Sequence, residues 1–209
     1  MQTFGDLMFT DAVRAEQEAR GSASQFALGY RRLGLGPDER QFIESRTSIY
    51  MATVNSAGWP YVQHRGGPAG FLKVIDEETL AFADYPGNRQ YVSTGNLAGD
   101  GRVSLYLGDY PQRARLKILA RAEILPAADH PALLAQLVVP KNIEPVKLFR
   151  LNVQALDWNC PKYITPRYSE AEIDAMLGPA MRRMADRIEE LEAELARRNG
   201  ASDTQGTQI

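Results

Sequence analysis

The chain has 209 residues, of which 44% are apolar and 24% charged, and its formal net charge at pH 7 is −2. This is the composition of an ordinary globular protein, and a near-neutral chain is not expected to have nucleic acid or an anionic membrane as its main partner. The single cysteine excludes an internal disulfide, two histidines give no basis for a metal site, and no apolar run approaches the roughly 20 residues that cross a bilayer, so we expect a cytoplasmic protein.

Residues 1–45 have the pattern of a peripheral helical extension. Thr10 has the side chain of a helix N-cap, and we expect a helix from there through about Ala19. Pro37, followed by two acidic residues, is placed like the first residue of a second short helix. After this point the pattern changes to that of β-strands.

The middle of the chain has the short apolar runs and turn signals of antiparallel β-structure. Turns are predicted at 55–58 and 109–111, and a short helix over 89–97 interrupts the strands. Six strands are predicted, at residues 47–54, 61–64, 71–75, 80–83, 102–108 and 114–125. A helix at 130–137 follows, and residues 146–158 form either a further strand or a pair of bends. Strands in hairpin order predict a mainly β (α+β) fold, an antiparallel barrel with peripheral helices.

The clearest helical segment covers residues 169–198, where Ser169 begins a capping box. Apolar side chains then follow alternating spacings of four and three, which define a heptad seam, at Leu177, Met181, Met184, Ile188, Leu191 and Leu195. Gly178 and Pro179 break or kink this segment, so the seam is expected in a second helix that begins at Pro179. We interpret the seam as a dimer contact and residues 199–209 as a disordered tail.

One candidate binding segment ends the second predicted strand, where Gln63 and His64 precede Arg65 and two glycines. Arginine presents a planar fork of donors that matches phosphate oxygens, and glycine lets a ligand approach the backbone closely. The segment therefore indicates an anion site. The alternative is that Arg65 is a solvated strand end, that His64 is a hydrogen-bonded bystander, and that Gly66 and Gly67 only form the corner.

A second candidate segment holds Asn88, Arg89 and Gln90. Asn88 is placed as a helix N-cap and Arg89 as the first helical residue, so free backbone N–H groups and a guanidinium would point the same way. Simple capping is the alternative. In a third segment, Lys162 can neutralise a ligand phosphate or be solvated, and Cys160 is interpreted as an inert thiol because no activating partner is visible.

Together these segments resemble the pyridoxamine 5′-phosphate oxidase-like flavin-binding proteins, in particular a bacterial branch with a QHRGGPxGF strand and a late NCPK motif. The motifs are YVQHRGGPAGF at 61–71, DYPGNR at 84–89 and NCPKYI at 159–164. The resemblance covers about residues 38–168. It implies a six-stranded split β-barrel that forms a homodimer and binds FMN at the subunit interface.

The resemblance also implies roles for single residues. The flavin phosphate falls to Arg65 and Arg89, and the other expected cofactor-binding residues are Gln63, His64, Gly66, Phe71, Asn88, Gln90, Cys160 and Lys162. Vitamin B6 oxidases of the family carry Arg-Lys where this chain has Arg89-Gln90, and the NCPK motif replaces their substrate-binding arginine motif. Both departures argue against B6 oxidation itself.

The leading hypothesis is an FMN-dependent oxidoreductase acting on a small molecule, with a nicotinamide as one candidate donor and with no catalytic residue assigned. The alternatives are a non-catalytic flavin-binding or redox-sensing protein, and a barrel that binds haem through His64. The expected organisation is a helical extension at 1–45, an FMN-binding split barrel at 46–168, a helix at 169–198 and a tail at 199–209.

Overall fold

The computed structural model describes residues 2–26, 34–158 and 162–203. The chain divides into two compact units, Met1–Thr165 and Pro166–Ile209, and each is described by itself. The first unit contains the whole sheet and the short helices, and the second contains the long C-terminal helix.

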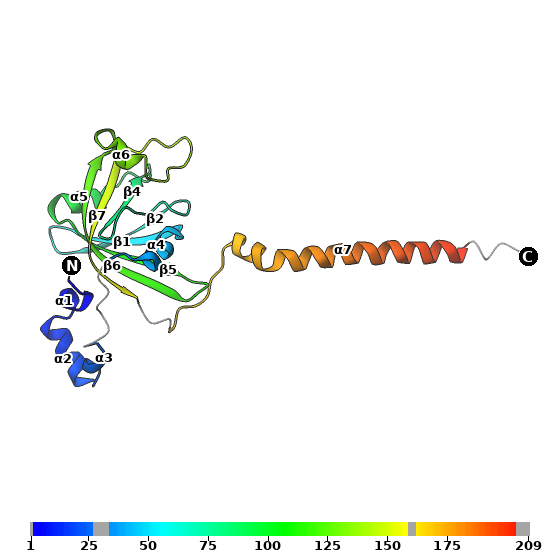
Figure 1. Ribbon diagram of the computed structural model, residues 1–209, viewed down its shortest axis with the longest axis horizontal. Helices are drawn as coiled ribbons and strands as arrows, with labels where there is room; N and C mark the ends of the chain where they lie inside the picture. Colours follow the sequence, from blue (N-terminus) through cyan, green and yellow to red (C-terminus); the bar gives the residue numbers. More distant parts are fainter. Residues whose placement is uncertain (1, 27–33, 159–161, 204–209) are drawn as a thin grey trace, which may run out of the picture. The chain divides into compact units, whose positions relative to one another are not determined.

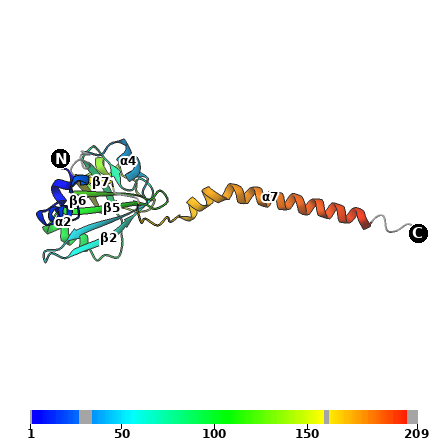
Figure 2. The same ribbon diagram turned by 90° about the horizontal axis from the view of Figure 1, so that it is seen from below.

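Seven antiparallel strands form one sheet in the order β2-β1-β5-β6-β7-β4-β3 (Figure 1). Their bounds are β1 Ser48–Val54, β2 Pro60–Gly66, β3 Lys73–Val74, β4 Thr79–Asp84, β5 Arg102–Asp109, β6 Ala114–Pro126 and β7 Lys147–Trp158. The sheet curls (Figures 1 and 2), and an ion pair of 2.6 Å between Arg65 on β2 and Asp84 on β4 joins the first strand in this order to the sixth. The mainly β, split-barrel fold is therefore confirmed.

The expected number of six strands is corrected to seven by β7. This strand lies between β6 and β4 and pairs with both, so it is central to the sheet. A register shift between Leu119 and Ala120 of β6 bends the ladder, and the alternation of buried and exposed residues in β7 is lost at Ala155–Asp157. This irregularity explains why the sequence pattern left residues 146–158 open between a strand and bends.

The inward-facing residues of the curled sheet form one main apolar core. Fully buried side chains come from strands far apart in sequence, among them Ile49, Met51, Leu105, Leu107, Leu116, Ile118, Phe149 and Leu151. The corner after β2 is fitted to this core, because a Cβ atom on Gly67 would lie only 2.7 Å from the Cβ atom of Phe71. The second glycine of the Gly-Gly corner therefore serves packing.

Within the described residues of the first unit, seven short helical segments accompany the sheet: α1 Phe4–Met8, α2 Asp11–Ala19, α3 Ala23–Phe26, α4 Pro37–Glu44, α5 Val92–Gly99, η1 Ala127–Asp129 and α6 Pro131–Leu134. The Thr10 side chain accepts a hydrogen bond from the Val13 N–H, which confirms the predicted cap. Pro37 begins α4, as predicted. The helix expected at 130–137 is shortened to α6, and the 3-10 turn η1 lies just before the expected range.

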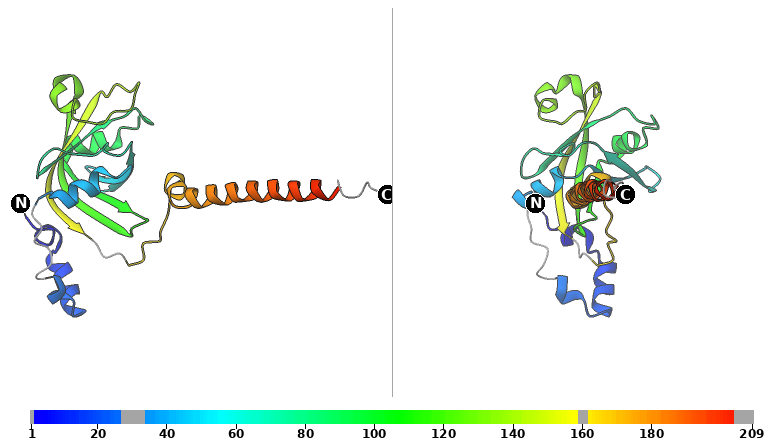
Figure 3. Two further views of the ribbon diagram at one scale, coloured as in Figure 1. Left: turned by 45° about the vertical axis from the view of Figure 1, so that its right-hand side comes forward. Right: turned by 90° about the vertical axis from the view of Figure 1, so that its right-hand side faces the viewer.

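Helix α7 covers Glu170–Asp203 as one helix (Figure 3), so the separate second helix expected at Pro179 is not formed. The predicted capping box is present, with the Ser169 N–H donating to Glu172 Oε2 at 2.7 Å. An internal proline costs roughly 3 kcal/mol, but the surrounding sequence is rich in the strong helix formers alanine, glutamate, arginine and leucine. Among the described residues, no helix combines the length and apolar character that a membrane span requires.

Candidate functional site

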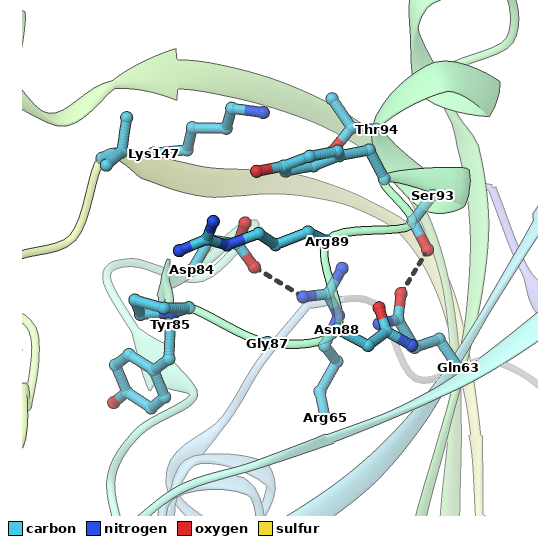
Figure 4. A pocket seen from close by; sticks show the side chains of 13 residues that line it. Gln63, Arg65, Asp84, Tyr85, Gly87, Asn88, Arg89, Ser93, Thr94 and Lys147 are labelled. Carbon is cyan, nitrogen blue, oxygen red and sulfur yellow. Dashed lines mark hydrogen bonds and ion pairs between the residues drawn. The ribbon is translucent and has the colours of Figure 1, made fainter.

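A cavity of about 310 Å³ opens where the end of β2, the end of β4, the start of β7 and the start of α5 meet (Figure 4). Its size is at the lower limit of small-molecule sites. The residues that line it are Gln63, Arg65, Asp84, Tyr85, Pro86, Gly87, Asn88, Arg89, Tyr91, Ser93, Thr94, Val146 and Lys147.

Arg65 forms one wall of this cavity. Its Nη1 donates to Asp84 Oδ1 at 2.6 Å, and its guanidinium carbon lies 5.0 Å from the centroid of the Phe149 ring. The Arg65 and Asp84 side chains are only 14% and 18% exposed, so the charges attract one another with little solvent screening. The buried Arg65 Nε has no hydrogen-bond partner, which leaves a donor unsatisfied at the cavity wall.

Gln63 lies on the same side of β2 as Arg65, because residues two apart on a strand face the same way. Its Oε1 accepts a hydrogen bond of 2.8 Å from Ser93 Oγ (Figure 4). Ser93 is the buried residue in the first turn of α5. This bond fixes the side-chain amide of Gln63 against the start of the helix.

The loop from Asn88 to Tyr91 differs from the predicted helix start. Asn88 Oδ1 accepts from the Gln90 N–H at 3.2 Å, so Asn88 caps a local turn, and α5 begins only at Val92. An asparagine side chain can satisfy a backbone N–H two residues on, which competes with a helix. Arg89 and Tyr91 have positive φ angles of 59° and 54°. Left-handed backbone at such residues costs of order 1 kcal/mol and tends to occur at functional sites.

Three cationic side chains line the cavity, of which Lys147 was not predicted. Its Nζ lies 4.9 Å from the centroid of the Tyr91 ring, and it begins β7 directly opposite Asp84 in the β4–β7 ladder. The third cation, Arg89, makes no hydrogen bond or ion pair within the described part of the chain. With Asp84 as the one acidic lining residue, the formal charge of the lining is three positive minus one negative, or +2.

Tyr85 also lines the cavity, and its hydroxyl proton is used in a hydrogen bond within the chain. Its hydroxyl donates to the Val138 carbonyl at 2.8 Å, and partial burial raises the pKa of the phenol above its ordinary value. The hydroxyl therefore stays protonated at physiological pH. The contact ties the end of β4 to the segment before β7.

The structure brings together four of the ten residues expected to bind cofactor, Gln63, Arg65, Asn88 and Arg89. The other described candidates are not among the residues that line this cavity: His64, Gly66, Phe71, Gln90 and Lys162. Cys160 lies outside the described residues, so its predicted role stays a prediction.

The candidates outside the cavity have clear local surroundings. His64 faces the other side of β2, where its Nε2 lies 2.7 Å from Ser48 Oγ and its ring 5.7 Å from that of Tyr50. Phe71 is buried in the barrel core, and Lys162 is exposed. No cluster of three or more potential metal ligands occurs among the described residues.

The cavity can therefore hold an anion. Two cationic side chains that are not bound in ion pairs, one paired guanidinium and one unsatisfied N–H surround this space. A carboxylate or phosphate group would find both charge and directed donors there. None of the lining side chains forms the hydrogen-bonded nucleophile and base pair typical of hydrolases.

Comparisons with known proteins locate the cavity within a recognised domain. The sequence profile described as pyridoxamine 5′-phosphate oxidase matches residues 35–160, which is more than half of the chain and includes every lining residue. Comparison with curated protein sequences gives no match.

Several solved structures are similar over part of the chain. One is an FMN-binding protein from Syntrophomonas wolfei, with 13% identity, a TM-score of 0.46, and coverage of 72% of this chain and 96% of that one. Another is a protein from Clostridium acetobutylicum related to general stress protein 26, with 15% identity, a TM-score of 0.46 and coverage of 58% and 85%. A third is the heme storage protein of Vibrio cholerae, with 20% identity, a TM-score of 0.38 and coverage of 59% and 94%.

The profile match spans the barrel from the segment before α4 to the end of β7. The chain belongs to the pyridoxamine 5′-phosphate oxidase family.

Proposed function

We propose that this protein is an FMN-binding flavoprotein, and that the cavity at the end of β2 holds the flavin phosphate. The observation that carries the proposal is the convergence of Arg65, Arg89 and Lys147 on one cavity inside the family-matched region. A phosphate monoester is close to a dianion at neutral pH, which complements the +2 formal charge of the lining. A phosphate oxygen that reached Arg65 Nε would also satisfy the buried N–H.

The residues would divide the work of binding. Arg65, held in place by Asp84, would present a preoriented guanidinium, and Arg89 and Lys147 would supply charge from the two other sides. Gln63, fixed by Ser93, would offer its amide along the remainder of the cofactor. When bound, FMN would supply hydride chemistry at its ring, and the protein would contribute binding and orientation.

The cavity of about 310 Å³ is small for a whole flavin mononucleotide. One protein chain would therefore hold the phosphate and part of the ribityl group of FMN. We therefore propose that a second copy completes the site and that the functional unit is a homodimer. The reaction is proposed to be oxidation or reduction of a small molecule, with no catalytic residue assigned.

The test is a titration of apoprotein with FMN, followed by quenching of flavin fluorescence. We expect micromolar or tighter binding by the wild type, and a loss of affinity of about 10- to 100-fold for Arg89→Ala and for Lys147→Ala, because each removes a charge-assisted contact of ~1.5–3 kcal/mol. Arg150→Ala is the matched control, since Arg150 lies on β7 and pairs with Glu123 away from the cavity.

No binding of FMN by the wild type would refute the proposed function. Binding that Arg89→Ala and Lys147→Ala leave unchanged would instead refute the phosphate site. Titration with haem, monitored in the Soret region, addresses the alternative ligand, and His64→Ala is the informative variant there.

A further inference from the structure

Helix α7 carries a stripe of apolar side chains that are exposed in the part of the chain that the structure describes. The six seam residues are each between 43% and 65% exposed: Leu177, Met181, Met184, Ile188, Leu191 and Leu195. Large aliphatic side chains exposed in a continuous row along one helix face mark an interaction surface, whereas scattered exposed residues need no explanation. We therefore interpret the stripe as a surface that binds a partner with a complementary apolar surface.

The spacing of the stripe defines that shape. The seam alternates steps of four and three residues, so Met181, Ile188 and Leu195 occupy the a positions of a heptad, and Leu177, Met184 and Leu191 the d positions. A strict seam at a and d fits a second helix with the same repeat. In parallel coiled coils a β-branched residue at a with leucine at d favours two helices, and Ile188 with Leu191 is the one layer of this seam that has both.

We propose that α7 pairs with α7 of a second copy of this chain, as a parallel, in-register, two-stranded coiled coil over residues 177–197. This inference is independent of the proposed flavin site. The charged residues that flank the seam determine the orientation and the register of the two helices.

The flanking charges favour the parallel arrangement. Arg187 is a g residue and Glu192 the e residue five positions later, and in a parallel, in-register pair each g residue lies beside the e residue of the other strand. The dimer would thus form two identical Arg187–Glu192 contacts. The remaining g and e residues of the central turns, Ala180 and Ala185, are small and uncharged.

The antiparallel pair that overlaps the whole seam has the opposite electrostatics. Pairing Met181 with Leu191 and Ile188 with Met184 brings the g residue Arg187 beside Arg187 of the other copy. Like charges at that position repel, so the flanking charges disfavour this fully overlapped antiparallel register. Within its own helix, Arg187 contacts Glu190 at 2.9 Å, and both side chains are more than 60% exposed. Arg187 therefore stays on the surface of α7, where it can reach a second helix.

The test uses the full chain with Cys160→Ser, so that an introduced cysteine is the single thiol. With Leu191→Cys added, we expect a disulfide between two copies in a glutathione redox buffer, because d residues face one another in a parallel pair. Ala193→Cys, on the outward face of the same turn, is the control and should give little cross-linking. A mixture of Met181→Cys and Leu191→Cys chains should give few mixed disulfides.

A charge exchange then tests the register. Adding Arg187→Glu to the Leu191→Cys chain should lower the cross-linked fraction about tenfold at low salt, since two attractive pairs become repulsive. Further addition of Glu192→Arg should restore it. Residues five apart do not face each other on one helix, so this rescue reports a contact between helices.

Three results would overturn the proposal. These are cross-linking of Leu191→Cys no greater than that of Ala193→Cys, a predominance of mixed 181–191 disulfides, and failure of Glu192→Arg to rescue Arg187→Glu. The residues substituted in addition to Cys160 all lie on α7, and flavin titration of the same chains reports on the barrel separately.

Discussion

Large aliphatic side chains are buried in the barrel and exposed on helix α7. Leu105 and Ile118 in the barrel are 0% exposed, whereas Leu191, the best covered residue of the α7 seam, is 43% exposed. A curled sheet encloses its apolar face within one chain, but a single helix has only a stripe and no second layer to cover it. The barrel therefore buries its own apolar residues, whereas the exposed seam of α7 is the surface that we propose a second copy covers.

The largest expected effect is on the free energy of unfolding, when one leucine in the barrel and one in α7 are each replaced by alanine. Leu105→Ala should lower the free energy of unfolding of the barrel by about 2–5 kcal/mol, because it removes buried methyl groups and leaves a cavity. Leu191→Ala should leave barrel stability unchanged within about 0.5 kcal/mol. Urea unfolding followed by tryptophan fluorescence measures both, since Trp59 and Trp158 lie in the first unit. Equal losses would show that the two regions fold as one.

A second, smaller difference concerns ion pairs within the barrel. Asp84→Asn should destabilise the fold by about 1–3 kcal/mol, because it leaves the largely buried guanidinium of Arg65 without its counter-charge. Glu123→Gln is the matched control. Its pair with Arg150 is about half exposed, so the expected loss is under about 1 kcal/mol. A loss for Glu123→Gln as large as that for Asp84→Asn would contradict the assignment of Arg65 as a buried, preoriented group.

The smallest effect is at an exposed pair beside β5. Hydrogen bonds from the Arg102 side chain and backbone lower the pKa of Asp100 from 3.8 to about 2. Because the folded pKa is depressed, the contribution to stability is complete above the unfolded value of 3.8 and is lost as the pH falls through about 2. Arg102→Ala should return the pKa towards 3.8. Carboxyl ¹³C shifts followed by NMR from pH 5 to pH 1.5 provide the measurement, and an unchanged midpoint in Arg102→Ala would refute the cause.

Short-range patterns predicted the strands and caps that depend on neighbouring residues. Thr10, Pro37 and Ser169 act as predicted because a cap is satisfied within three or four residues of chain. The helix predicted to begin at Arg89 begins instead at Val92, since the Asn88 side chain serves a tight turn. The caps and this turn all depend on hydrogen bonds between residues close in sequence. The error at Arg89 arose because an asparagine side chain can either cap a helix or accept a hydrogen bond within a tight turn.

The candidate site was predicted in part for a similar reason. The motif residues Gln63, Arg65, Asn88 and Arg89 lie at the cavity, while His64 faces away because strand neighbours alternate sides. Lys147 was missed, since it lies 58 residues after Arg89 in the chain and reaches the site only through the pairing of β7 with β4. A lysine that begins a strand has no feature in sequence that distinguishes it from a solvated one.

The sequence by itself determined the family, through its motifs, and the heptad spacing of α7. Both are patterns of residues that lie close together along the chain. Only the tertiary structure decided that Asp84 holds Arg65 and that Lys147 and Arg89 complete a cavity of positive charge. The physical reason is register: which residues meet across a sheet is fixed by the pairing of distant strands and by the core that they jointly bury.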